Sequence, residues 1–312
     1  MKLFKRISIV LLVLVVLLEI TLRLYGLGNP VLYIEDADYE YIYAPNQDVK
    51  RFGNHIVTNE FGMRSKPINK NDSIVVLIIG DSVLNGGTQV DQDSLTTTIL
   101  ENSLSEKFKQ TIRVLNISAG SWGPDNAVEF IKKHGTFNSF LLVFVFSSHD
   151  YHDPITHKKV VGILEAYPSK KPTFAISELI NRYLLKSNLQ NKSKTTKAPK
   201  ILREQWSRNL QINKGWNQIV DLKNKNIGVI GYIHPMKSEL EKKQYNTLGN
   251  MLISKLEADS VEFITGMNYM VPDAYRDDIH TNAKGHRILS NALEPIIEDK
   301  IKANFFSNKT LK

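Results

Sequence analysis

The stretch Ile74-Val-Val-Leu-Ile-Ile-Gly-Asp-Ser82 decides the fold, because six consecutive apolar residues lead directly into a glycine turn. A short apolar run bounded by a turn residue is typical of a strand buried on both faces. Four more apolar runs follow, with helical segments between most of them. The predicted strands cover 74–79, 111–117, 140–146, 225–233 and 261–265, and the predicted helices cover 91–108, 124–134, 237–256 and 281–302. This alternation predicts a three-layer α/β/α fold around a parallel five-stranded sheet.

Residues 73–305 form the predicted domain, and two further segments precede or interrupt it. Residues 29–72 contain many Tyr, Asn and Pro residues with little periodicity, so we expect an extended lead-in with short strands such as Asn54–Thr58. Residues 150–224 break the alternation of strands and helices and are predicted to be an insertion. Within the insertion, Lys186–Lys200 is polar and poor in apolar residues, which is typical of a mobile, solvated loop.

The charge and cysteine content exclude several classes of protein. The 312 residues include 40 Lys and Arg and 32 Asp and Glu, which gives a net charge of +8. Six basic residues lie between Lys186 and Arg203 with no acid among them, and three more are Lys2, Lys5 and Arg6. The remainder is close to neutral, so a basic nucleic-acid groove is not expected. The absence of cysteine excludes disulfides, a thiolate nucleophile and a cysteine-based zinc site.

The N-terminus predicts a transmembrane signal anchor over residues 1–28. A basic cap, Met1–Arg6, precedes the apolar run Ile7–Leu18, and continuing to Leu24 gives about 20 residues, or roughly 30 Å of helix. Glu19 and Arg23 lie four residues apart and can pair at the outer interface. The positive-inside rule then predicts a single-pass protein of the cell inner membrane with its domain on the periplasmic or extracellular side.

Two other interpretations of this N-terminal segment stay open. A cleaved signal peptide needs small residues before its cleavage site, and Leu24-Tyr-Gly-Leu-Gly-Asn29 offers no good A-x-A pattern. A buried hydrophobic helix of the globular domain is the other alternative. We favour the anchor.

Two polar motifs follow the first and fifth predicted strands, at the sheet edge where open parallel sheets bind ligands. Gly80-Asp81-Ser82 leaves the Ser82 hydroxyl at a strand-to-helix junction. No G-x-x-x-x-G-K-[ST] and no G-x-G-x-x-G occurs here, which excludes a phosphate loop and a dinucleotide fingerprint. Asp277 and His280 are three residues apart, so one turn can place a carboxylate against an imidazole nitrogen. This is the arrangement that activates a serine, although either motif alone would be an ordinary turn.

Taken together, the two motifs resemble the first and last sequence blocks of the SGNH/GDSL hydrolase superfamily. The last block also matches at Asn282 and Gly285, and the resemblance covers roughly 73–302. In the lead-in, Asn59-Glu-Phe-Gly-Met-Arg64 is similar to membrane-anchored members that are associated with bacterial surface polysaccharides. The resemblance implies the flavodoxin-like SGNH hydrolase fold.

The resemblance also implies roles for individual residues. Ser82 would be the nucleophile, His280 the base and Asp277 the residue that orients the base. Asp81, beside the nucleophile, is a candidate substrate-binding residue. No cofactor and no metal are predicted.

The two middle blocks of the family are altered in this chain. The second-block glycine falls on Ser121, with Gly120 and Gly123 beside it, and the backbone N–H of Ser121 can still donate to an oxyanion. The third-block asparagine falls on His149, whose imidazole can also donate, and Asp150 matches the aspartate that follows. Turn-shaping glycines and surface histidines are the alternatives.

A metal site is a further alternative for the segment after the third strand. Imidazole and carboxylate groups lie close together there, although no H-E-x-x-H spacing occurs. The candidate ligands are His149, Asp150, His152, Asp153 and His157.

These observations predict a membrane-anchored serine esterase that removes ester groups, O-acetyl groups in our interpretation, from a glycan or a related small ester. The same fold would also serve an O-acetyltransferase that modifies a surface polysaccharide. A non-catalytic glycan-binding or assembly protein that uses the same cleft is the alternative from a different class.

Overall fold

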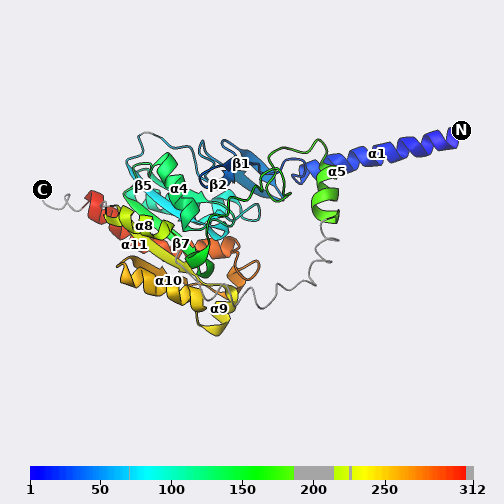
Figure 1. Cartoon of the computed structure of the whole chain (residues 1–312). Coiled ribbons are helices and arrows are strands. Elements are labelled where there is room, and N and C mark those ends of the chain that lie inside the picture. Colours follow the sequence, from blue (N-terminus) through cyan, green and yellow to red (C-terminus); the bar gives the residue numbers. More distant parts are fainter. Residues whose placement is uncertain (70, 186–213, 225–226, 307–312) are drawn as a thin grey trace.

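The computed structural model describes residues 1–69, 71–185, 214–224 and 227–306 (Figure 1). At its centre is an all-parallel sheet of five strands in the order β6-β5-β7-β8-β9. The strands are β5 (Ile74–Gly80), β6 (Ile112–Ser118), β7 (Leu141–Ser147), β8 (Gly228–His234) and β9 (Glu262–Thr265). The predicted α/β fold is therefore confirmed, and residues 225–226 of the predicted fourth strand lie outside the described residues. Since β6 and β7 flank β5, the loops after these two strands lie on either side of the turn that carries Ser82.

Helices cover both faces of the sheet, and alternate residues of β5 point to opposite faces. Ile74, Val76 and Ile78 share one core cluster with α3 (Thr96–Phe108) and α11 (Ala283–Ile301). The intervening residues of β5 lie in a second cluster on the other face. That cluster also contains side chains of α4 (Pro124–His134), α8 (Gly215–Asn224) and α10 (Thr247–Ala258). Both faces are therefore buried, as the continuous apolar strands predict.

Two predicted helices are shorter or divided in the structure. The helix expected over 91–108 begins at Thr96, because Asp91 caps a separate 3-10 turn, η1 (Gln92–Ser94), and Leu95 is extended. The helix expected over 237–256 is divided into α9 (Lys237–Lys242) and α10, since Lys243 adopts a left-handed conformation and Asn246 caps a new helix.

Short elements complete the fold. They are α2 (Ser82–Asn85), α5 (Ala175–Glu178), the 3-10 turns η2 (Ser148–His152), η4 (Gly266–Asn268) and η5 (Pro272–Ala274), and the π-helical segments η3 (Leu179–Leu185) and η6 (Lys302–Phe306). The insertion predicted at 150–224 thus contributes α5, η3 and α8, and its Lys186–Lys200 loop lies outside the described residues.

The lead-in forms two antiparallel hairpins that pack on the domain. They are β1 (Tyr33–Asp36) with β2 (Glu40–Tyr43), and β3 (Asp48–Arg51) with β4 (Asn54–Val57). Tyr41, Ile42 and Met63 belong to the same core cluster as the interior of the sheet. The lead-in is therefore part of the domain's core, although its sequence has little periodicity.

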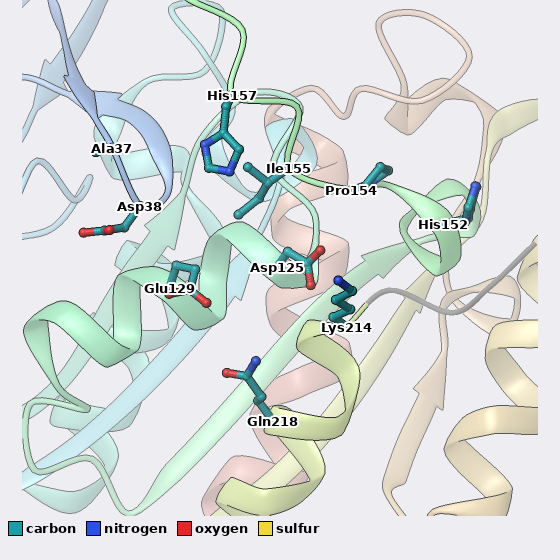
Figure 2. Close-up of a pocket in the computed structure, with 10 residues that line it drawn as sticks. All are labelled: Ala37, Asp38, Asp125, Glu129, His152, Pro154, Ile155, His157, Lys214 and Gln218. Carbon is teal, nitrogen blue, oxygen red and sulfur yellow. The ribbon is translucent and has the colours of Figure 1, made fainter.

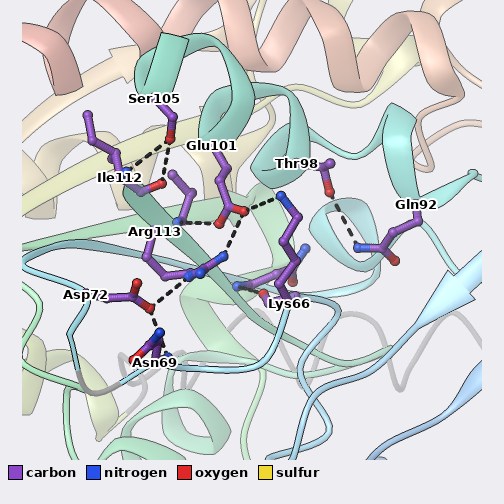
Figure 3. Close-up of polar contacts among 12 residues, drawn as sticks. Lys66, Asn69, Asp72, Gln92, Thr98, Glu101, Ser105, Ile112 and Arg113 are labelled. Carbon is purple, nitrogen blue, oxygen red and sulfur yellow. Dashed lines mark hydrogen bonds and ion pairs between the residues drawn. The ribbon is translucent and has the colours of Figure 1, made fainter. Parts of the chain in front are cut away.

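An ionic network fixes the end of the lead-in to the sheet (Figure 3). Arg113 of β6 contacts Asp72 at 3.0 Å and Glu101 of α3 at 2.9 Å. Lys66 contacts the same Glu101 carboxylate at 2.8 Å. Because Arg113, Asp72 and Glu101 are largely removed from solvent, breaking one pair would leave a poorly solvated charge.

At the N-terminus, α1 (Lys2–Leu24) projects away from the domain (Figure 1). None of its residues is buried, and its mean hydropathy reaches 2.6. By length and composition α1 could cross a membrane, and a signal sequence would have the same properties.

Gly62→Ala should destabilise the protein more than the matched variant Gly53→Ala. Both glycines have positive φ, 76° and 83°, so both variants carry the backbone cost of about 1 kcal/mol. A Cβ at Gly62 would lie 2.1 Å from the carbonyl oxygen of Tyr43, whereas a Cβ at Gly53 would meet no atom within 4 Å. Denaturant unfolding should show an additional loss of about 1–3 kcal/mol for Gly62→Ala. Equal losses would contradict the packing of this turn against β2.

Candidate active site

The turn after β5 presents Ser82 at the carboxyl edge of the sheet. Asp81 is the N-cap of α2, and its Oδ1 accepts a hydrogen bond from the backbone N–H of Val83 at 2.7 Å. Gly80 allows close packing before the turn, because a Cβ there would approach Leu84 and Val145 to between 3.1 and 3.3 Å. Ser82 remains partly exposed while its neighbours on both sides are buried.

Asp277, His280 and Ser82 form a continuous hydrogen-bonded chain. His280 Nε2 lies 3.0 Å from Ser82 Oγ, and His280 Nδ1 lies 2.8 Å from Asp277 Oδ2. Partial burial would raise the pKa of Asp277, but hydrogen bonds from the backbone N–H groups of His280 and Ile279 and from the imidazole outweigh it and lower the pKa to about 2. Asp277 is therefore ionised at neutral pH and can fix the orientation of the imidazole.

His234, at the end of β8, supports the loop that carries His280. It is fully buried, and its Nε2 lies 3.0 Å from the carbonyl oxygen of Ile279. Burial lowers the pKa of His234 to about 4, so the ring is neutral and Nε2 donates to this carbonyl. The backbone N–H of Lys237 donates to the carbonyl of Asp278 at 2.7 Å and holds the same loop. His234 thus acts on the site through the backbone and does not line it.

The loop after β6 places its three predicted residues in different environments. Ser121 is exposed and has φ of 59°, a conformation that is unusual for serine. The Gly120 carbonyl accepts a hydrogen bond from Tyr41 at 2.6 Å. The Gly123 N–H donates to Asn126 Oδ1 at 3.0 Å, and a Cβ at Gly123 would lie 2.4 Å from the Asp153 carbonyl oxygen. Gly123 is therefore engaged in packing, whereas the Ser121 N–H donates to no acceptor among the described residues.

His149 lies against two buried carboxylates after β7. Its Nε2 is 3.6 Å from Asp81 Oδ2 and 3.4 Å from Asp150 Oδ1. Burial would lower the pKa of His149, but the charges of Asp150 and Asp81 outweigh it and raise the pKa. Burial also raises the pKa of Asp81, and it raises the pKa of Asp150 to about 8. At neutral pH the Asp150 carboxyl therefore keeps a proton that an exposed carboxyl would have lost.

The metal ligands that the sequence suggests are not brought together as one set. His152 and His157 line a pocket beside α4. Among the described residues, the group with ligand atoms within 4.8 Å of one another is instead Asp81, His149 and Asp150. Asp81 and Asp150 already accept backbone hydrogen bonds, from Val83 and Ser147 respectively.

Figure 2 shows the pocket beside α4, which has a volume of about 570 Å³. Its lining includes Asp125 and Glu129 of α4, Gln218 of α8 with Lys214 just before that helix, and His152, Pro154, Ile155 and His157. The pocket lies next to the loop after β6, since Asp153 packs directly on Gly123. It is open to solvent, and its lining combines apolar surface with carboxylate, imidazole, amide and ammonium groups.

A buried polar network behind the nucleophile was not predicted from the sequence. The Arg64 guanidinium donates to the carbonyl oxygens of Asn85 at 2.8 Å, Gly87 at 2.7 Å and Val90 at 3.1 Å. Asn85 in turn accepts from Tyr43 at 3.0 Å. Arg64 is the last residue of the Asn59–Arg64 motif, so the sequence does single out this arginine. The motif does not indicate which loop the arginine contacts.

No protein-family model matches this chain, and no curated protein matches it. Among solved structures it is similar to a lipase/acylhydrolase from Enterococcus faecalis, with 11% identity over 73% of this chain and 96% of that chain and a TM-score of 0.44. A member of the lipolytic G-D-S-L family from Veillonella parvula matches with 9% identity over 76% and 100% of the two chains and a TM-score of 0.40. A two-domain esterase active on acetylated mannans matches with 10% identity over 74% and 50% and a TM-score of 0.43. Likenesses at this level carry no functional inference, which has to rest on the geometry above.

Asp150→Asn should gain stability relative to wild type as the pH rises from about 5 to about 8. The carboxyl loses its proton near pH 4 in the unfolded chain and near pH 8 in the folded one, so its contribution to native stability declines across this window. Asparagine cannot titrate. Unfolding measured at several pH values would show the trend, and the exposed Asp93→Asn serves as a control. A difference that does not vary with pH would contradict the raised pKa.

Proposed function

We propose that this chain is a serine hydrolase of the SGNH/GDSL superfamily that cleaves carboxylic esters. The observation that carries the proposal is the chain of hydrogen bonds from Asp277 through His280 to Ser82 at the carboxyl edge of the sheet. Sequence motifs for the nucleophile and the base lie 198 residues apart and meet within hydrogen-bonding distance. A structural serine would not need an oriented imidazole on its hydroxyl.

The geometry supports an acyl-enzyme mechanism. His280 Nε2 accepts the Ser82 proton as Oγ attacks the ester carbonyl, and the imidazolium then protonates the leaving alkoxide as the C–O bond breaks. In the second half, His280 takes a proton from water, the hydroxide attacks the acyl-serine, and Ser82 regains its proton from the imidazolium. Asp277, ionised throughout, stabilises the imidazolium in both steps.

We assign the oxyanion to three donors. The backbone N–H groups of Ser82 and Ser121 make no hydrogen bond to any of the described residues, which leaves them available. His149 would be the third donor. Its Nε2 faces Asp81 and Asp150, so a ring held through Nε2 would still have Nδ1–H to offer to the substrate. An imidazole N–H can donate to the oxyanion as the amide of the family's asparagine does.

The substrate we propose is an O-acetylated glycan. The pocket beside α4 supports this, because its carboxylates, imidazoles, amide and ammonium groups suit the hydroxyl groups of a sugar. An acetyl group is small enough to need no apolar channel at Ser82. The chain would be held in the cell inner membrane by α1, with the domain on its outer side, as the basic cap and the hydropathy of α1 suggest.

Ser82→Ala should reduce hydrolysis of a short p-nitrophenyl ester by about a thousandfold or more, since loss of a triad member typically costs several orders of magnitude. The fold should be unaffected, because the hydroxyl has His280 as its hydrogen-bond partner and makes no buried contact. Ser254→Ala, an exposed serine of α10, is the matched control. Turnover within tenfold of wild type would refute the assignment of the nucleophile.

His149→Asn should keep far more activity than His149→Ala. Asparagine restores a neutral donor, whereas alanine removes a stabilising contact worth about 2 to 4 kcal/mol, or about a hundredfold or more in kcat. Comparing kcat of the two variants, with and without EDTA, separates the roles. A metal ligand would make both variants poor and the wild type sensitive to EDTA, and a surface histidine would leave both fully active.

A further inference from the structure

The domain forms hydrogen bonds with α1 before the helix ends. Glu19, one turn from the end of α1, accepts hydrogen bonds from the backbone N–H groups of Ala175 at 2.8 Å and Ile176 at 3.0 Å. Arg23 pairs with Glu19 at 2.7 Å and donates to the carbonyl of Thr173 at 2.8 Å. The start of α5 therefore lies beside α1 at the level of Glu19.

A second set of contacts makes this junction rigid. The Glu178 carboxylate accepts from the backbone N–H of Gly28 at 2.7 Å and pairs with the buried guanidinium of Arg51. Arg51 also donates to the carbonyl of Gly26 at 2.7 Å. A Cβ at Gly26 would lie 2.6 Å from the carbonyl oxygen of Lys50, so the chain after α1 is packed closely against β3.

If α1 spans a bilayer, the depth of Glu19 in that bilayer also sets the depth of α5, because the two are hydrogen-bonded. Leu24 ends α1 five residues after Glu19, which is about 7.5 Å of helix. Glu19 directly follows the unbroken apolar run Ile7–Leu18, which alone covers only about 18 Å of a hydrocarbon core roughly 30 Å thick. Residues after Leu18 must cover the rest of the core, so Glu19 and the start of α5 lie no higher than the boundary between the core and the headgroup layer. The pairing with Arg23 and two amide groups explains how a carboxylate is satisfied at that depth.

The surface of the segment that begins there is apolar. Five large side chains in it are at least 39% exposed, which is unusual for neighbouring residues of a soluble surface. They are Phe174, Ile180, Tyr183, Leu184 and Leu185. Figure 1 shows α5 and the helical segment after it running across the direction of α1, as a helix lying in the plane of the interface would.

Cationic groups flank the apolar side chains. Lys170 and Lys171 are exposed just before the segment, and Arg182 lies within it. Basic residues beside an apolar helix face favour anionic lipid headgroups, and tyrosine is enriched at the same depth.

We infer that Thr173–Leu185 is an interfacial lipid-binding element, inserted into the headgroup layer of the outer leaflet beside α1. This inference rests on the proposed membrane span of α1. The domain is then held on the bilayer at two places, by the span and by this segment, instead of being tethered by a single helix.

Site-specific labelling can test the inference, because the chain contains no cysteine. Phe174→Cys, Val13→Cys in the middle of α1 and Glu257→Cys on the exposed face of α10 would each carry an NBD fluorophore. The full chain is reconstituted in vesicles of phosphatidylcholine and phosphatidylglycerol that contain nitroxide lipids, with the spin label either near the headgroup or deep in the acyl chain. A second probe at Leu185→Cys guards against a local effect of labelling at Phe174.

We expect the probes at 174 and 185 to lose most of their fluorescence to the shallow quencher and less to the deep one. The probe at 13 should respond most to the deep quencher, and the probe at 257 should respond to neither. If 174 and 185 behave like 257 while 13 is quenched, α1 spans the membrane and the inferred lipid contact is wrong. If none of the four is quenched, the anchor and this inference both fail.

Discussion

The buried guanidinium of Arg64 is the constraint on which the catalytic edge depends. It is 1% exposed, it has no carboxylate partner among the described residues, and it is satisfied by backbone carbonyls of the loop that follows Ser82. Burial lowers the pKa of Arg64 to about 10, which still leaves it charged at neutral pH. A buried charge of this kind is costly unless its donors are hydrogen-bonded, so movement of the loop would leave Arg64 with unpaired donors. The turn that carries Ser82 is thereby tied to a residue of the lead-in, so the lead-in supports the proposed active site as well as joining α1 to the domain.

The main features of the fold and the three residues of the proposed triad could be predicted because their signals are local. Runs such as Ile74–Ile79 are buried on both faces, and an Asp-x-x-His spacing fixes its own geometry within one turn. In the lead-in, the short strand expected at Asn54–Thr58 is present as β4. The pairing of four such strands into two hairpins could not be predicted, because each strand is four residues long and alternates little in sequence. At the break between α9 and α10, the Glu239 carboxylate accepts from the backbone N–H of Asn246 and from Ser148, which is 91 residues away in the sequence, so this support could not be foreseen.

The surroundings of His149 show that a sequence motif does not predict the chemical environment of its residues. The sequence places a histidine where the family has asparagine, but it does not indicate that Asp81 and Asp150 converge on the same ring nitrogen. Both carboxyls carry raised pKa values because they are buried, which is a cost to the folded state. Strongly shifted pKa values of this kind are concentrated at functional sites. If Asp81, His149 and Asp150 were all deprotonated, they would attract a metal cation. The protonation state of these three side chains therefore decides whether they bind a cation or donate a hydrogen bond.

The short path from α1 to the catalytic edge has a kinetic consequence. Gly26 and Arg51 lock the end of the helix to β3, and the neighbouring strand β2 reaches the nucleophile loop through Tyr43 and the Gly120 turn through Tyr41. With α1 in a bilayer, these contacts would hold Ser82 at one height and one orientation instead of letting the domain swing on a tether. A polymer still attached to the same membrane would then meet the site by diffusion in two dimensions. Its encounter rate would scale with the number of chains per unit area, and free oligosaccharides in the surrounding fluid would be at a disadvantage.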